Sequence, residues 1–350
     1  QSVLGDLPEI LVVTNPENAS DLPGAQVFAA AHPIPDQIGL KAGQTVIAAL
    51  QRASAAQRPV LCLISGGGSA LLPTPIVGIS LQDKINLNAL LLGSGANIEV
   101  MNLIRQQLSL LKGGGMLRYS SPSPVISLIL SDVIGDDLRA VASGPTVSPI
   151  GTRLQACSEL KALGLWGQTN AAVKTALERP EENIDLPVTK NILIGSNVLS
   201  LVAMGKEIPE ATIHKMPLVG DVSQAAARVA AAGPGIHLFG GETTVRLTGT
   251  GRGGRNQELA LRVALLAEYQ NWQGRWLYLQ AGTDGRDGPT DAAGGVVCEA
   301  SVSAMSSVGI DPNQLLANND AYSALQAAKA LLITGGTGTN VADLGVLIRA

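Results

Sequence analysis

The chain has 350 residues, of which 46% are hydrophobic, 15% are charged and 40 are glycine. This length predicts two domains or one large one, and either can bury a core without disulfides or a structural metal. The hydrophobic content excludes a disordered chain, and no apolar run reaches the roughly 18–20 residues of a membrane span. A net charge of −4 provides neither the basic surface of a nucleic-acid-binding protein nor a polybasic membrane anchor.

The three cysteines, Cys62, Cys157 and Cys298, are far apart and form no C-x-x-C pair. Buried, reduced thiols are the simplest interpretation of this spacing. The sequence shows no basic segment followed by an apolar one at its start, so it contains no recognisable signal peptide. We therefore expect a cytoplasmic protein.

Short apolar runs rich in β-branched residues predict strands. In chain order they cover 9–14, 59–64, 125–130, 191–194, 235–239, 245–247, 275–280 and 345–348. The stretches between them predict helices, with Ser80 as the N-cap of the second. These helices cover 42–56, 80–92, 98–111, 152–163, 171–178, 223–231, 256–269 and 321–330. Strands that alternate with helices favour an α/β fold with a largely parallel sheet.

A polar, proline-broken stretch at 178–190 predicts a surface loop within the first domain. The boundary between the two domains is expected between 208 and 234, so that the domains cover 1–215 and 235–350.

Glycines gather where predicted strands end. Open α/β sheets bind ligands beyond the carboxyl ends of their strands, so these loops are candidate binding sites. They lie at 65–70, 112–115, 195–197, 240–244, 249–256, 281–295 and 334–340.

The first of these loops is Ser65-Gly66-Gly67-Gly68-Ser69. Consecutive glycines let backbone N–H groups approach a phosphate or carboxylate closely, and the hydroxyls can add donors. The loop is not a Walker A motif, because the Lys-Ser/Thr ending is absent. A flexible strand-to-helix turn is the alternative.

An acidic loop follows the strand predicted at 125–130. Asp132 comes directly after this strand, with Asp136 and Asp137 four and five residues later. Mg²⁺ is commonly held by one or two carboxylates while substrate phosphates supply further ligands. Helix capping combined with a solvated acidic turn is the alternative.

The loop at 249–256 contains a G-x-G-x-x-G pattern, Gly249, Gly251 and Gly254. This dinucleotide fingerprint is weak in a glycine-rich chain. Arg252 and Arg255 are more informative, because a cation at a helix N-terminus opposes the helix dipole. An anionic ligand explains them better than stability does, and Arg suits bidentate binding of phosphate or carboxylate.

Three acids, Asp284, Asp287 and Asp291, lie in the loop after the strand predicted at 275–280. Their spacing does not fit an EF-hand. One of them could be a general base and another a supporting or metal-binding group. Asx-turn chemistry is the alternative for at least one of them. No H-E-x-x-H, G-x-S-x-G or Cys/His pattern occurs, which argues against a zinc enzyme or a serine hydrolase.

Several motifs together resemble one family, the MOFRL-type glycerate kinases or glycerate 2-kinases. SGGGSALL, SGANIEVMNLIRQQLSLLKGGG and LSDVIGDDLRAVASGPT are similar to its N-terminal domain, the DUF4147 domain. GGETTVRLTGTGRGGRNQELAL, AGTDGRDGPTDAAGG and TGGTGTNVADL are similar to its C-terminal MOFRL domain. The likeness runs in the same order from about residue 10 to the end of the chain.

This resemblance implies ATP-dependent, Mg²⁺-assisted phosphorylation of D-glycerate at its 2-hydroxyl, giving 2-phosphoglycerate and ADP. It implies two α/β domains. The first would be Rossmann-like with a largely parallel sheet and an incomplete start, and the second a smaller mixed α/β domain.

The resemblance also implies site residues. The active-site arginine is Arg255, with Arg252 as the fallback, and the acids Asp284 and Asp287 are catalytic candidates. Asp132 and Asp137 are the candidate metal ligands. The remaining candidates would bind substrate or phosphate, and they are Ser65, Gly66, Gly67, Gly68, Ser69, Lys112, Asn197, Glu242, Arg252, Asn256 and Asp291.

Family members carry an upstream segment whose Lys contributes to catalysis, whereas this chain begins after that segment, at Gln1. If the segment were absent, we would expect impaired or lost catalysis and an exposed part of the first domain's core. Two other functions stay open here, an NAD(P)-dependent hydroxypyruvate reductase and a non-catalytic, truncated binding protein. The expected partners are D-glycerate and ATP, with no nucleic acid and no membrane, and a homodimer is left open.

Overall fold

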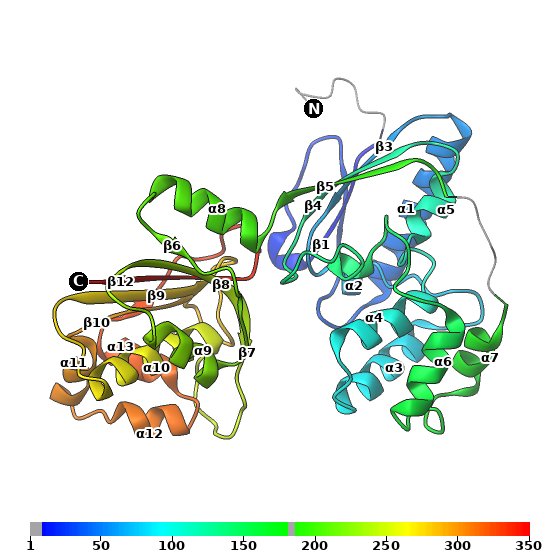
Figure 1. The fold of residues 1–350 in the computed structure, drawn as a ribbon. Helices are drawn as coiled ribbons and strands as arrows, with labels where there is room; N and C mark the ends of the chain where they lie inside the picture. The colour runs from blue at the N-terminus through cyan, green and yellow to red at the C-terminus, as the bar shows by residue number, and fades with distance from the viewer. Residues whose placement is uncertain (1–8, 181–185) are drawn as a thin grey trace. The chain divides into compact units, whose positions relative to one another are not determined.

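The computed structural model describes residues 9–180 and 186–350, so part of the loop expected at 178–190 lies outside the described residues (Figure 1). The chain divides into two compact units. The first unit contains the residues up to Leu130 and Asp136–Ile194, and the second contains Ser131–Gly135 and Gly195–Ala350.

This division falls earlier than the boundary expected between 208 and 234. Strand pairing explains the difference, because two short strands before position 234 pair with the first long strand of the second unit. These are β6 (Thr212–Ile213) and β7 (Leu218–Asp221), and both pair in parallel with β8 (Gly235–Thr244).

The first unit contains parallel strands. A parallel pair consists of β1 (Leu11–Thr14) and β2 (Gln26–Ala29). A second sheet has the order β3 (Val60–Ile64), β4 (Val125–Leu130), β5 (Thr189–Gly195), and in it β3 and β4 are parallel. The parallel α/β character expected for this part of the chain is therefore confirmed.

Helices make up much of the rest of the first unit. They are α1 (Gln37–Ala55), α2 (Gly68–Leu71), α3 (Leu81–Gly93), α4 (Ile98–Gln107), α5 (Gly115–Ser120), α6 (Arg153–Ala162) and α7 (Ala171–Glu178). Helix α3 begins as predicted, because Ser80 Oγ accepts a hydrogen bond from the Asp83 N–H at 3.1 Å. The Asp83 carboxylate in turn accepts from the Ser80 N–H at 2.8 Å, and such a reciprocal cap stabilises a helix by about 1 kcal/mol.

The apolar core of the first unit lies mainly among α3, α4, α6 and α7. The spacing of aliphatic residues on these helices places one stripe of each toward the others. Leu91, Ile104, Leu160 and Leu177 are examples of side chains that this packing buries almost completely.

The second unit is built on one mixed sheet. Its strand order is β11-β10-β9-β12-β8-β6, and β7 also pairs with β8. The new strands are β9 (Trp276–Gly282), β10 (Gly294–Cys298), β11 (Leu331–Leu332) and β12 (Asp343–Arg349). Strand β12 lies between β8 and β9 and is antiparallel to both. This confirms the mixed α/β character expected here, whereas the separate strand predicted at 245–247 is wrong, because β8 ends before it.

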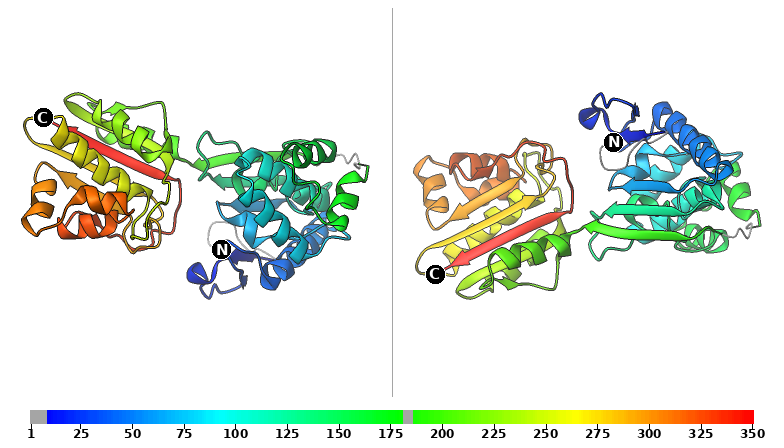
Figure 2. Two further views of the ribbon diagram at one scale, coloured as in Figure 1. Left: turned by 90° about the horizontal axis from the view of Figure 1, so that it is seen from below. Right: turned by 90° about the horizontal axis from the view of Figure 1, so that it is seen from above.

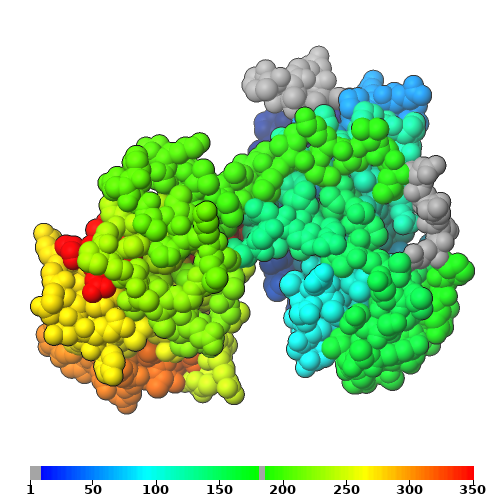
Figure 3. All heavy atoms as spheres, viewed as in Figure 1, coloured from blue at the N-terminus to red at the C-terminus, as the bar shows by residue number. Residues whose placement is uncertain are grey.

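Helices cover both faces of this sheet (Figure 2). One face carries α8 (Asn197–Glu207), and the other carries α9 (Val222–Ala230), α10 (Arg255–Tyr269), α11 (Ser301–Ser307), α12 (Pro312–Ala317) and α13 (Ala321–Ala327). Helix α10 is central to the core, where it packs with Phe239 and Tyr278 of the sheet. In the face shown in Figure 3, the red of the last residues appears only in small patches, because β12 is enclosed by its neighbours.

The three cysteines are free thiols in the structure, with Cys62 and Cys157 buried and Cys298 half-buried. Burial raises the pKa of the Cys62 thiol to about 11, which keeps it protonated near neutral pH. Among the described residues, no helix combines the length and the hydrophobicity that crossing a bilayer requires.

Candidate functional site

Arg255 is the first residue of α10, and two carboxylates hold its side chain. Its Nε donates to Asp343 Oδ2 at 2.6 Å and its Nη2 donates to Asp343 Oδ1 at 3.0 Å, while Nη1 lies 3.2 Å from Glu242 Oε1. Burial lowers the pKa of Arg255, but the hydrogen bonds and charges of these carboxylates outweigh burial and raise it. A guanidinium carries five N–H donors, so two remain for a ligand.

Asp343, the first residue of β12, was not singled out in the sequence. Its side chain is 1% exposed, whereas that of Arg255 is 36% exposed. The start of β12 is fixed by Asn197, whose Nδ2 donates to the carbonyl oxygens of Val341 and Asp343, both at 2.9 Å. Asn197, predicted to bind substrate, is 6% exposed and fixes the backbone at Asp343, and its role toward a substrate stays a prediction.

Three carboxylates of the second unit raise the pKa of a fourth, Glu242, beside Arg255. Burial raises the pKa of Glu242, and so do the charges of Asp343, Asp132 and Asp284, while Arg255 lowers it. Arg255 thus pairs with Asp343 and Glu242, and the charges of Asp132 and Asp284 act on Glu242. A hard divalent cation held by oxygen ligands fits such a group.

No group of three or more His, Cys, Asp or Glu side chains has the arrangement of a metal site within the described parts of the chain. Mg²⁺ commonly takes one or two protein carboxylates and obtains other ligands from phosphates and water. Glu242 and Asp132 are the residues that could hold it.

Asp137, the second predicted metal ligand, does not lie in this group. It belongs to the first unit and pairs with Arg139, which donates from Nε and Nη2 at 2.8–3.2 Å. The Arg139 hydrogen bonds lower the pKa of Asp137. Because both of its oxygens accept from Arg139, the structure favours the turn-stabilising alternative for this residue.

Asp287 caps helix α10 and does not face an open site. Its carboxylate accepts from the Asn256 N–H at 3.1 Å, the Gln257 N–H at 2.8 Å and Gln257 Nε2 at 3.0 Å. Burial raises its pKa, although these hydrogen bonds counteract the rise. Asp287 and Asn256 thus both have partners within the protein, and their predicted catalytic and binding roles stay predictions. Asn256 is fully buried and bonds Asp287 and Gln280, which stabilises the loop.

Asp284 and Asp291 are more accessible than Asp287. Asp284 is half-buried, and its Oδ1 accepts from the Arg286 N–H at 3.0 Å. Asp291 is exposed and accepts from the Tyr322 hydroxyl at 2.9 Å, while Arg252 stacks on the ring of Tyr322 at 4.6 Å. A hollow of about 530 Å³ lies beside Asp291.

The glycines of the G-x-G-x-x-G pattern are explained by close packing. A Cβ at Gly249 or Gly251 would overlap the Asn318 backbone, and one at Gly254 would overlap Asp287. The loop is also fixed by Asn319, whose Oδ1 accepts from the N–H groups of Thr248 and Gly249 at 2.7 and 2.9 Å. These glycines therefore need no dinucleotide to account for them.

In the first unit, the glycine-rich loop 65–69 leads into α2 and lies against a chain of polar side chains. Lys112 Nζ donates to Ser69 Oγ at 2.8 Å, Ser69 Oγ lies 2.9 Å from Ser143 Oγ, and Ser143 donates to Asn102 Oδ1 at 3.2 Å. Lys112 is 7% exposed, whereas Ser65 is exposed and Ser69 half-buried. The predicted residues Lys112 and Ser69 are thus brought into direct contact.

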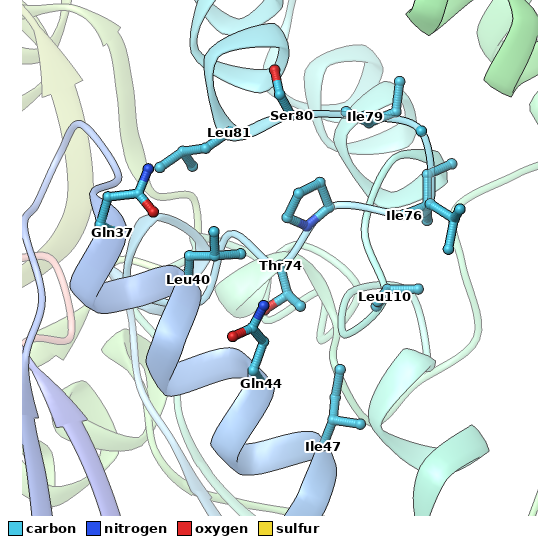
Figure 4. A pocket seen from close by; sticks show the side chains of 13 residues that line it. Gln37, Leu40, Gln44, Ile47, Thr74, Ile76, Ile79, Ser80, Leu81 and Leu110 are labelled. Atoms are coloured by element: carbon cyan, nitrogen blue, oxygen red, sulfur yellow. The ribbon is translucent and has the colours of Figure 1, made fainter.

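A pocket of about 450 Å³ lies elsewhere in the first unit (Figure 4). Gln37, Leu40, Gln44 and Ile47 of α1 form one wall, and the segment 74–81 with Leu110 forms the rest. Its lining is largely aliphatic and includes none of the predicted site residues.

Comparison with known proteins places the chain in a family. Residues 1–178 match the family model for a domain of unknown function (DUF4147), and residues 235–343 match the MOFRL family. A glycerate kinase from Rattus norvegicus is 39% identical over 92% of this chain and 73% of that protein. A D-glycerate 2-kinase from Thermotoga maritima is 38% identical over 91% of this chain and 79% of its own.

Solved structures agree with this similarity. The crystal structure of a glycerate kinase from Thermotoga maritima superposes with a TM-score of 0.88 at 36% identity, covering 98% of this chain and 85% of that one. A protein from Pyrococcus horikoshii gives a TM-score of 0.82 at 36% identity, covering 99% and 83% of the two chains. The chain belongs to the DUF4147 and MOFRL family of these glycerate kinases, and the resemblance seen in the loop motifs is confirmed.

Proposed function

We propose that the protein is a glycerate 2-kinase that transfers the terminal phosphoryl group of ATP to the 2-hydroxyl of D-glycerate, giving 2-phosphoglycerate and ADP. The observation that carries this proposal is the 38% identity to a D-glycerate 2-kinase over 91% of the chain. The proposal includes ATP and Mg²⁺ as cofactors, a cytoplasmic location and a homodimer as the oligomeric state to test.

The group around Arg255 has the chemistry that phosphoryl transfer needs. Such a reaction requires positioning and charge neutralisation more than covalent chemistry. Arg255 is held by Asp343 and Glu242 with two N–H donors left, so it can bind an equatorial phosphoryl oxygen or the carboxylate of glycerate without reorganising. Mg²⁺ held by Glu242 and Asp132 would supply neutralisation of phosphate charge.

Asp284 is the best candidate for the general base. Its Oδ1 is occupied by the Arg286 N–H, and Asp287 is buried as a helix cap. Asp284 Oδ2 would accept the proton of the 2-hydroxyl as the oxygen attacks phosphorus. Asp291 already accepts from the Tyr322 hydroxyl, which suits it to substrate positioning.

Catalysis by a dinucleotide-dependent reductase is less well supported. Its sequence basis was the G-x-G-x-x-G pattern, and packing against Asn318 and Asp287 accounts for those glycines. In addition, β12 separates β8 from β9, so the loop does not lie in a βαβ unit of adjacent parallel strands.

A coupled assay of the purified full-length protein tests the proposal. We expect ADP to form only when D-glycerate, ATP and Mg²⁺ are all present, and ³¹P NMR to identify the product as the 2-phosphate. Formation of the 3-phosphate, or NADH oxidation by hydroxypyruvate in the absence of ATP, would contradict it. Light scattering during the same preparation determines whether the protein is a dimer.

A further inference from the structure

Two of the three histidines of the chain face each other at the end of the second sheet where β6 lies. His214 directly follows β6, and His237 lies on β8. His214 Nε2 lies 3.1 Å from His237 Nδ1, and His237 Nε2 lies 3.0 Å from the carbonyl oxygen of Gly233. The ring of His214 also stacks on that of Phe239, with 4.2 Å between the ring centroids. We call His214 and His237 the histidine pair.

The Gly233 carbonyl fixes which ring nitrogen of each histidine carries a proton. A carbonyl oxygen only accepts, so His237 Nε2 is the donor to it. In a neutral imidazole the other nitrogen then accepts, so His237 Nδ1 accepts a hydrogen bond from His214 Nε2. When both rings carry a proton on each nitrogen, two donors face each other and this hydrogen bond cannot form. The histidine pair therefore keeps its bond only while His237 Nδ1 is unprotonated.

The charges that act on His214 are positive. Burial lowers the pKa of His214, and the charges of His237 and of Arg228 on α9 lower it further. Among the described residues, no carboxylate pairs with either ring of the histidine pair. The other charged side chains of the elements beside the pair are Lys206 and Glu207 of α8, Glu210 and Lys215 on the two sides of β6, and Arg349 of β12.

The histidine pair lies where few backbone bonds hold the chain to the sheet. Strands β6 and β7 both lie along β8 (Figure 1), and β6 pairs with it over only two positions. The His214 N–H adds one hydrogen bond, to the Leu238 carbonyl oxygen at 2.9 Å. Residues 215–217 then lead to β7, where Val219 lies opposite Glu242 of β8. A segment with so few backbone bonds opens easily, so the bond between the two rings contributes much to holding it.

We propose that the histidine pair is an acid-sensitive latch, which holds the segment from β6 to β7 against β8 at neutral pH and releases it when both rings are protonated. The closed form takes up at most one proton, whereas the open form takes up two below the ordinary histidine pKa of about 6.5. Acid therefore shifts the equilibrium toward the open form. The released segment includes the residue opposite Glu242, a candidate Mg²⁺ ligand. The latch does not depend on the proposed function, because its test uses no substrate.

Amide hydrogen exchange of the whole chain at pH 7, 6 and 5, corrected for the intrinsic pH dependence of exchange, tests the proposal. The wild type is compared with His214→Gln. The Gln amide nitrogen is as many bonds from the backbone as His Nε2, and the amide can turn to donate or accept, but it does not titrate. His32→Gln, at the exposed third histidine, is the matched control.

In the wild type we expect the opening of residues 212–221 to increase as the pH falls below about 6.5, by up to about tenfold per pH unit. His32→Gln should behave in the same way, whereas in His214→Gln the opening should change by less than about twofold. The amides of β12, which pairs on both sides, serve as the internal reference. An opening that does not depend on pH in the wild type, or that depends on it equally in His214→Gln, would overturn the proposal.

Nitrogen NMR of the imidazole rings separates the latch from a general loss of stability in acid. At neutral pH we expect both His214 and His237 to carry their proton on Nε2. The latch would be excluded if His237 carried its proton on Nδ1 instead. It would also be excluded if both rings became fully protonated while residues 212–221 stayed as protected from exchange as at pH 7.

Discussion

In the second unit Arg255 is surrounded by Asp343, Glu242 and neighbouring carboxylates, whereas in the first unit Lys84, Arg105 and Lys112 contact only neutral acceptors among the described residues. The first arrangement fixes one guanidinium and leaves an acid surplus that suits a metal cation. In the second, burial without an opposing carboxylate lowers the pKa of Lys84 and Lys112. The comparison teaches that the partners of a charged side chain, more than its type, indicate what it could bind.

The largest expected effect is on Asp284. As the base of the proposed reaction, its replacement in Asp284→Asn should lower kcat by about 10²–10⁴-fold, with a Tm close to that of the wild type because the side chain is half-buried. Steady-state kinetics with saturating ATP measure this effect. Activity within fivefold of the wild type would remove Asp284 from the mechanism and direct attention to Asp291.

Arg255→Ala should lower kcat/KM for D-glycerate by at least about 10²-fold, because it removes donors that stabilise developing charge. It also leaves the buried Asp343 without its partner, so some loss of stability is expected.

The double variant Arg255→Ala/Asp343→Asn separates these two effects. It should regain stability through the loss of the unpaired carboxylate but stay as inactive as the single variant. Recovery of activity along with stability would show that Arg255 is only structural.

Asp287→Asn should lower the free energy of unfolding by about 2 kcal/mol. Both carboxylate oxygens of Asp287 accept hydrogen bonds from backbone N–H groups, whereas the amide of Asn has one oxygen and would turn its NH₂ group toward one of those donors. Urea unfolding measures this change. At a temperature where the variant is folded, its kcat should stay within about threefold of the wild type. A large loss of kcat at unchanged stability would restore Asp287 as a catalytic residue.

The smallest effect concerns pH. The pKa of Lys84 is about 7 in the folded protein and 10.5 for a lysine in water, and the cations Lys112 and Arg105 face it without an opposing carboxylate. Between these values the unfolded chain binds more protons, so the free energy of unfolding should rise with pH, by about 1 kcal/mol from pH 7 to 9 after allowance for solvent screening.

Thermal unfolding at pH 7, 8 and 9 measures this dependence. Lys84→Met should flatten it, because the variant lacks the ammonium group whose pKa burial lowers. A dependence that is the same in Lys84→Met as in the wild type would assign it to other groups.

Local signals predicted much of the fold from the sequence. Strand β4 and helix α7 have the predicted bounds, because a largely aliphatic run defines the strand and the N-cap Asn170 begins the helix. Short strands such as β6 and β11 were missed, because only their pairing with distant strands makes them strands.

The candidate site was predicted as a set of loops but not residue by residue. Asp284 and Asp287 look alike in the sequence, and only the packing of their loop against α10 assigns Asp287 to the helix cap. Asp343 lies in the TGGTGTNVADL motif but was not singled out, because its pairing with Arg255 across 88 positions carries no local signal. Lys84 and Arg105 were not singled out, because burial cannot be read from charge alone.

The position of β12 has a consequence for how the protein is made. This strand is synthesised after β8 and β9, yet it lies between them and pairs with both. During synthesis, β8 and β9 therefore cannot complete their strand pairing until residues 343–349 have been made. Arg255 is synthesised 88 residues before Asp343, so in a nascent chain its guanidinium lacks the buried carboxylate partner until residue 343 has been made. Because β12 completes the sheet, the candidate site can assemble only after the strands and helices that support it have been synthesised.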